Sequence, residues 1–183
     1  EAISKVTTAD VGYLFKIKDE GQLKKEISNQ LKESKIANGI DINNLDDKNH
    51  DVKELIIYPF EEHNKDNKNK IKVNIVDTGY GISQILPIII NSLIDDSSTI
   101  LVQQPETHLH PRLQAEVGSI ITKSINLKNK KNYRRMLRIG MGIEKNWIIE
   151  THSETLLFRL LKEIRKGNLD KDDLNVLYID HDK

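Results

Sequence analysis

The stretch Thr99-Ile-Leu-Val-Gln-Gln-Pro-Glu106 decides the fold class of this 183-residue chain. Its apolar residues end in two glutamines and a proline, the pattern of a buried strand that delivers polar groups to one edge of an α/β sheet. Pro105 has no amide hydrogen and therefore ends the strand ladder. An acidic residue and two histidines follow at alternate positions: Glu106, His108 and His110.

The segment Trp147-Ile-Ile-Glu-Thr-His-Ser153 repeats this arrangement. It begins as an apolar strand and ends in Thr151 and His152, and Ser153 is suited to cap the helix that follows. At the carboxyl ends of parallel strands, acidic residues and histidines suit the handling of Mg²⁺ and water in phosphoryl transfer. We therefore expect both strand exits at one edge of the sheet.

A third segment, Asp77-Thr-Gly-Tyr-Gly-Ile-Ser-Gln84, precedes an apolar helix. We expect Ser83 or Gln84 to cap this helix and Pro87 to lie in its first turn. Gly79 and Gly81 have no side chains to cover the backbone just ahead of a helix N-terminus, where free amide groups favour an anion. The segment therefore predicts a place for a phosphate group.

After residue 76, strand patterns alternate with helix patterns. We expect strands at residues 100–103, 147–150 and 174–179, and helices at residues 83–94, 112–125 and 153–166. This alternation predicts an α/β fold with a mostly parallel sheet flanked by helices. We assign these elements to one lobe, residues 71–183.

Residues 1–70 form a separate N-terminal segment of strands, a helix and polar loops, either part of the same fold or an insertion. The amphipathic pattern at residues 21–35 predicts a helix, and residues 11–18 alternate like a half-buried strand. The Asn- and Asp-rich residues 36–51 read as a loop. Two β-rich runs, 55–60 and 71–76, lie either side of a polar stretch and predict a hairpin or two strands joined by a long loop.

The composition excludes several classes of protein. The 28 basic and 28 acidic residues cancel, so net charge favours neither nucleic acid nor a membrane surface. Without cysteine there is no disulfide, thiolate nucleophile or zinc–thiolate site, in agreement with a cytoplasmic location. No apolar run approaches the roughly 20 residues that span a bilayer. Because the chain opens with Glu1 rather than Met, we expect a processed, truncated or excerpted polypeptide.

Together the three segments resemble the C-terminal lobe of an ABC-type ATPase, a P-loop NTPase fold. The likeness is to the prokaryotic OLD-like and SMC-like AAA-family ATPases of anti-phage defence and DNA repair. It covers residues 71–180. Residues 79–84 resemble the signature loop, 100–106 the Walker B strand, 107–111 the D-loop and 151–153 the H-switch. The sequence contains no Walker A motif, the Gly-rich loop ending in Gly-Lys-Ser or Gly-Lys-Thr that holds nucleotide phosphates.

The resemblance implies a homodimer that sandwiches ATP and Mg²⁺. The signature loop of one copy would reach the γ-phosphate bound by the other, through Gly79, Gly81, Ser83 and Gln84. Gln103 stands where the family carries the acid that holds Mg²⁺ through water, and Gln104 or Glu106 stands near the position that polarises the attacking water. His152 would contact the γ-phosphate, and the two sites would be linked by His108 and His110.

Glutamine at position 103 departs from the family pattern. Its neutral amide cannot act as an anionic partner of Mg²⁺ or as a base, which predicts slow hydrolysis or none. Gln103 is either a natural divergence or an engineered replacement of glutamate. We expect a longer polypeptide whose upstream segment supplies Walker A, and whose ATP-driven dimerisation controls a partner effector or nuclease.

Two alternatives remain open. A metal-dependent hydrolase or nuclease could use zinc or manganese held by four side chains: Glu106, His108, His110 and His152. A nucleic-acid-binding scaffold could use a basic cluster around Tyr133, formed by Lys128, Lys130, Lys131, Arg134, Arg135 and Arg138.

Overall fold

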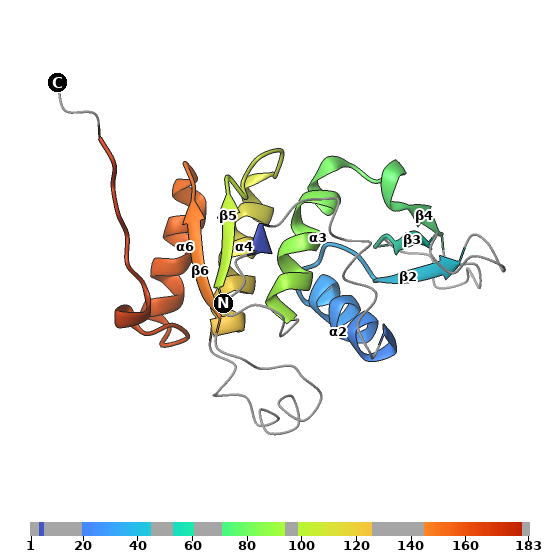
Figure 1. The fold of residues 1–183 in the computed structure, drawn as a ribbon, viewed down its shortest axis with the longest axis horizontal. Coiled ribbons are helices and arrows are strands. Elements are labelled where there is room, and N and C mark those ends of the chain that lie inside the picture. The colour runs from blue at the N-terminus through green and yellow to red at the C-terminus, as the bar shows by residue number, and fades with distance from the viewer. Residues whose placement is uncertain are drawn as a thin grey trace.

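The structure, a computed structural model, describes residues 4–5, 20–44, 53–60, 71–93, 99–125 and 145–180. In these ranges it is a mixed α/β fold with four α-helices and two three-stranded sheets (Figure 1). The helices are α2 (Glu20–Glu33), α3 (Tyr80–Leu93), α4 (Pro111–Ile125) and α6 (Glu154–Arg165). The predicted strand at residues 11–18 and the basic cluster at residues 128–138 lie outside the described residues.

The first sheet is parallel and has the strand order β1-β5-β6. Its strands are β1 (Ser4–Lys5), β5 (Thr99–Gln103) and β6 (Asn146–Glu150). The register pairs Ile100 with Trp147 and Gln103 with Glu150, so both strands end at the same level. The expected parallel pairing of the strands at residues 100–103 and 147–150 is therefore confirmed. No pattern in the sequence had indicated β1.

One face of the parallel sheet is covered and the other is open to solvent. Ile100 and Val102 are buried, whereas Leu101 and its partner Ile148 are 38% and 57% exposed. Gly118 lets α4 approach α6 closely. A Cβ at this position would lie only 3.1 Å from Arg159 Cγ and 3.4 Å from the Leu156 carbonyl oxygen. The apolar run of β5 is consequently half-buried, not buried on both faces as its composition suggested.

The second sheet is antiparallel and lies mainly in the N-terminal segment, outside the region after residue 76 for which a mostly parallel sheet was expected. It consists of β2 (Gly39–Asn44), β3 (Lys53–Tyr58) and β4 (Val73–Asn74). The pairing of β3 with β4 confirms the two strands expected around the polar stretch. The second strand is shorter than expected and passes into a 3-10 turn, η2 (Ile75–Asp77), which Asn74 caps.

Residues 36–51 were expected to form a loop, but β2 lies within them. Every residue of β2 pairs with β3, from Gly39 opposite Tyr58 to Asn44 opposite Lys53. Ile40 is buried opposite Ile57, and this contact outweighs the low strand propensity of the surrounding Asn and Asp residues.

Helix α3 lies between the two sheets and joins their cores (Figure 1). Its residues 85–92 are all buried. Helix α2 confirms the amphipathic prediction: it packs on β2, and three of its apolar side chains are buried, those of Leu23, Ile27 and Leu31. Buried side chains from residues on both sides of position 70 form a single cluster.

The predicted strand at residues 174–179 pairs with no other strand in the described part of the chain. After a short 3-10 turn, η4 (Lys171–Asp173), the chain extends beside α6 with Leu177, Tyr178 and Ile179 exposed (Figure 1). High β-propensity describes side chains that suit a sheet, but a ladder also needs a neighbour with free backbone groups. Within the described ranges, no helix has the length and apolarity to cross a bilayer.

Candidate functional site

The turn after β5 contains two strained backbone positions. Gln104 donates its amide hydrogen to the Glu150 carbonyl oxygen at 2.7 Å, which carries the pairing with β6 one residue past the strand. Gln104 and His108 have φ values of 47° and 61°. Such left-handed conformations cost about 1–2 kcal/mol in residues other than glycine and occur preferentially where structure serves function.

Glu106 lies between these two residues and connects the exits of β5 and β6. Its Oε2 accepts a hydrogen bond from Thr151 Oγ1 at 2.7 Å, and its Oε1 accepts one from the backbone amide of His152 at 2.7 Å. The carboxyl group is half-buried. Two sequence segments that were predicted to meet are therefore joined by one side chain.

Ser153 caps α6, as its sequence position predicted. Its Oγ accepts a hydrogen bond from the Leu156 amide at 3.0 Å and donates one to Gln114 Oε1 at 2.7 Å. Gln114 Nε2 in turn donates to the Leu109 carbonyl oxygen at 2.9 Å. Nothing in the sequence had marked Gln114, because a single polar residue on an amphipathic helix resembles any other.

Helix α3 begins at Tyr80, so the expected capping by Ser83 or Gln84 is wrong. Ser83 lies inside the first turn and donates its hydroxyl hydrogen to the Tyr80 carbonyl oxygen at 2.8 Å. Pro87 lies inside the helix rather than in its first turn, and it removes one helical hydrogen bond there.

The start of α3 packs against the turn after β5. A Cβ on Gly81 would lie 3.3 Å from Leu113 and 3.7 Å from Leu109, whereas Gly79 faces open space. The rings of Tyr80 and His108 lie with their centroids 5.6 Å apart. All three segments singled out in the sequence thus gather at one end of the parallel sheet, at the top of Figure 1.

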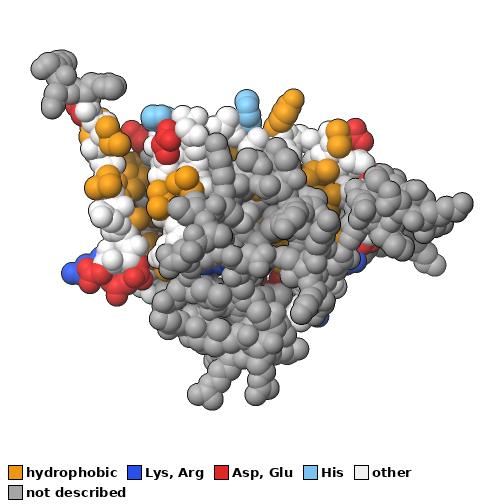
Figure 2. Space-filling view, viewed as in Figure 1, with side chains coloured by type: hydrophobic (Ala, Val, Ile, Leu, Met, Phe, Trp, Pro, Cys, Tyr) orange, Lys and Arg blue, Asp and Glu red, His pale blue; other side chains and the backbone are white. Residues whose placement is uncertain are grey.

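Several candidate side chains at this end are exposed. They are Gln103, Gln104, His108, His110 and His152. Figure 2 shows histidine side chains along the same edge of the molecule. Ser83 and Gln84 are partly exposed at the start of α3.

The metal site considered as an alternative, formed by Glu106, His108, His110 and His152, is not assembled in the structure. These four residues are all described, and in the described part of the chain no three His, Asp or Glu side chains group to hold a metal ion. Three of them have other contacts. Both oxygens of Glu106 accept protein hydrogen bonds, and His108 lies against Tyr80. His110 Nδ1 accepts a hydrogen bond from the Arg112 amide at 3.3 Å, in the first turn of α4.

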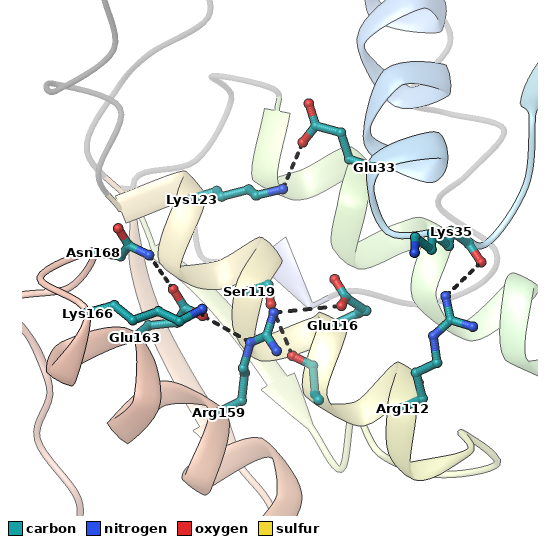
Figure 3. A network of polar contacts seen from close by, with 11 residues as sticks. Glu33, Lys35, Arg112, Glu116, Ser119, Lys123, Arg159, Glu163, Lys166 and Asn168 are labelled. Carbon is teal, nitrogen blue, oxygen red and sulfur yellow. Dashed lines mark hydrogen bonds and ion pairs between the residues drawn. The ribbon is translucent and has the colours of Figure 1, made fainter.

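Behind the site, Arg159 of α6 pairs with Glu163 in its own helix and with Glu116 of α4 (Figure 3). Arg159 Nε lies 3.1 Å from Glu163 Oε1, and Arg159 Nη2 lies 3.7 Å from Glu116 Oε1. Lys166 and Asn168 also contact the Glu163 carboxyl group, at 3.6 and 2.6 Å. Burial opposes ionisation of Glu163, but the Asn168 hydrogen bond and the two cations outweigh it and lower its pKa.

A second pair of contacts joins the other side of α4 to the end of α2. Lys123 Nζ lies 2.8 Å from Glu33 Oε2, and Arg112 Nη2 donates to the Lys35 carbonyl oxygen at 3.3 Å (Figure 3). The helix that begins just after the D-loop-like segment is therefore held on two sides.

The geometry suits an anion or a phosphorylated ligand. Adjacent parallel strands end side by side, as in other α/β folds that bind ligands at their carboxyl edge. The N-terminus of α3 lies at the same end, and the positive end of a helix dipole favours a negative group. Among known proteins, no family model, no curated protein and no solved structure matches this chain.

Proposed function

We propose that this chain is the C-terminal lobe of an ABC-type ATPase that binds ATP and Mg²⁺. The observation that carries the proposal is the meeting of its three motif-like segments at one end of the parallel sheet. Glu106 binds Thr151 and His152, and His108 lies against Tyr80. Exposed polar groups from three segments therefore lie where α/β folds bind their ligands, at the carboxyl ends of parallel strands.

In this proposal Gln103 and Gln104 face the nucleotide. Gln103 is the last residue of β5 and is exposed, so its amide can reach a water bound to Mg²⁺. We give the water-polarising position to Gln104 rather than Glu106, because both oxygens of Glu106 already accept hydrogen bonds. Neither glutamine carries charge, so hydrolysis by this chain is slow.

The exposed His152 then contacts the γ-phosphate, and the start of α3 faces a second copy. Gly79 is exposed there, beside Tyr80 and Val76, which are 75% and 84% exposed. A segment carrying Walker A would complete the site, since none occurs in the sequence. Dimer closure around ATP would control an effector or nuclease, in anti-phage defence or DNA repair.

ATP binding and turnover by the polypeptide that includes the Walker A segment test this proposal. We expect ATP binding with Gln103 present, and turnover that rises at least tenfold in Gln103→Glu, because a carboxylate restores the anionic partner of Mg²⁺.

The matched control is Asn146→Asp, which places the same change of charge at the opposite end of β6. We expect no gain in turnover from it. If neither the Gln103 nor the Gln103→Glu form binds ATP, the proposal is wrong.

A further inference from the structure

We propose that Glu106 is a positioning residue, whose carboxylate holds the turn after β6 and thereby presents His152 beside the exit of β5. The inference rests on the proposed nucleotide site for its consequence in turnover. Its structural part, the attachment of one strand exit to the other, stands on the hydrogen bonds of this chain alone.

The attachment has two points. Thr151 and His152 are neighbours in the chain, and each donates to a different oxygen of the same carboxylate, both at 2.7 Å. Hydrogen bonds to an ionised acceptor are shorter and stronger than those between neutral groups. Two such bonds to adjacent residues fix both the orientation of the turn and its distance from Glu106. They thereby fix the backbone from which the imidazole of His152 extends.

The contacts continue into a closed ring. The Ser153 amide donates to Thr151 Oγ1 at 3.0 Å, and Ser153 Oγ donates to Gln114 Oε1 at 2.7 Å. Gln114 Nε2 donates to the Leu109 carbonyl oxygen at 2.9 Å, and the Leu109 amide donates to the Glu106 carbonyl oxygen at 3.0 Å. The exits of β5 and β6 and the starts of α4 and α6 are thus tied together around Glu106.

A role as base would conflict with this attachment. A protonated Glu106 would turn one of its oxygens from acceptor to donor, and the backbone amide of His152 can only donate. A proton on Oε1 would therefore remove the bond from the His152 amide, whereas a proton on Oε2 would reverse the bond with Thr151, whose hydroxyl oxygen can also accept. The strained backbone of Gln104 and His108, on either side of Glu106, also indicates a turn held in place by its contacts.

Three substitutions at the attachment separate a positioning role from a reacting one. Glu106→Ala removes both acceptors, Glu106→Gln keeps one acceptor oxygen, and Thr151→Val removes one donor while leaving the carboxylate intact. The matched control is Glu154→Gln, which changes an exposed carboxylate in the first turn of α6. Circular dichroism and thermal unfolding establish that each variant is folded.

The first readout is hydrogen exchange at the His152 amide, which needs no nucleotide. We expect exchange about tenfold faster or more in Glu106→Ala, a smaller increase in Glu106→Gln and none in Glu154→Gln, with core amides of α3 unchanged. Unchanged protection of the His152 amide in Glu106→Ala overturns the inference.

The second readout is ATP turnover in the Gln103→Glu background of the polypeptide that carries Walker A. We expect kcat to fall about tenfold in Glu106→Ala and less in Glu106→Gln and Thr151→Val, with KM changed less than about threefold. Equal, near-complete loss of kcat in Glu106→Gln and Glu106→Ala, with Thr151→Val unaffected, would instead identify Glu106 as a base.

The two readouts keep the inference distinct from the proposed function. If the polypeptide does not bind ATP, the proposed function fails, while the exchange of the His152 amide still tests the attachment. If ATP is hydrolysed but exchange at His152 does not depend on Glu106, the proposed function stands and the positioning role fails.

Discussion

Trp147 donates a hydrogen bond from its indole Nε1 to Ser124 Oγ at 2.8 Å, which joins the parallel sheet to the last turn of α4. Ser124 is buried and passes its own hydrogen to the Ile121 carbonyl oxygen at 2.7 Å. Trp147 is paired in register with Ile100 of β5. The contact therefore fixes the end of α4 opposite the candidate site.

Replacing Trp147 with Phe should lower the free energy of unfolding by about 1–2 kcal/mol, because it removes this hydrogen bond and some buried surface. Urea unfolding followed by circular dichroism measures the change, since the variant loses the only tryptophan. Ser124→Ala removes the same bond from the other side. The double variant should destabilise by less than the sum of the two single variants, and full additivity would show that the bond contributes nothing.

Replacing Ser153 with Ala should destabilise the fold by about 1–2 kcal/mol, because Ser153 both caps α6 and binds Gln114. Thermal or urea unfolding measures this loss. Ser83→Ala is the matched control, since the Ser83 hydroxyl bonds only within its own helical turn in the contacts described. We expect less than about 0.5 kcal/mol from the control. Equal effects of the two substitutions would contradict the assignment of Ser153 as the cap.

The stability that Glu163 contributes to the fold should be lost in acid. Its folded-state pKa is lowered, because the Asn168 hydrogen bond and the cations Lys166 and Arg159 outweigh the effect of burial. A lowered carboxyl pKa contributes stability above the unfolded value, about 4.3, and that stability is lost as the pH falls through the folded value.

Urea unfolding at several pH values between about 3 and 7 tests this dependence. Glu163→Gln should be less stable than the parent chain at neutral pH and should lose less stability on acidification. Glu154→Gln, at an exposed carboxylate, should follow the parent chain. A parallel loss of stability in the parent chain and in Glu163→Gln would contradict the role of this carboxylate.

Much of the fold could be predicted, because the spacing at which apolar residues recur indicates which face of a helix or strand is buried. Helices α2, α4 and α6 follow from that spacing, and strands β5 and β6 follow from apolar runs that end in polar residues. Strand β2 was missed, because its Asn and Asp residues have low strand propensity and the sequence does not show that β3 pairs with it. Residues 174–179 were expected in a sheet, and their composition could not tell whether a neighbouring strand would be present.

The candidate site was predictable as a set of segments but not as a set of contacts. Polar residues at the ends of apolar runs marked Glu106 and His152, and parallel strands bring such ends to one edge. The spacing could not show that Glu106 binds the His152 amide, that His108 lies against Tyr80, or that Gln114 takes part. For the same reason the spacing could not show that the alternative metal cluster does not assemble among the described residues.

The sequence by itself determined most of the helices and the strands whose polar ends mark the candidate site, because the pattern of apolar and polar residues is a local property of the chain. Only the tertiary structure decided which neighbour each polar side chain binds. From the sequence, Glu106 could bind a metal, a ligand or the turn after the neighbouring strand. Which of these its carboxylate contacts depends on hydrogen-bond distances, accurate to a few tenths of an ångström, between residues far apart in sequence.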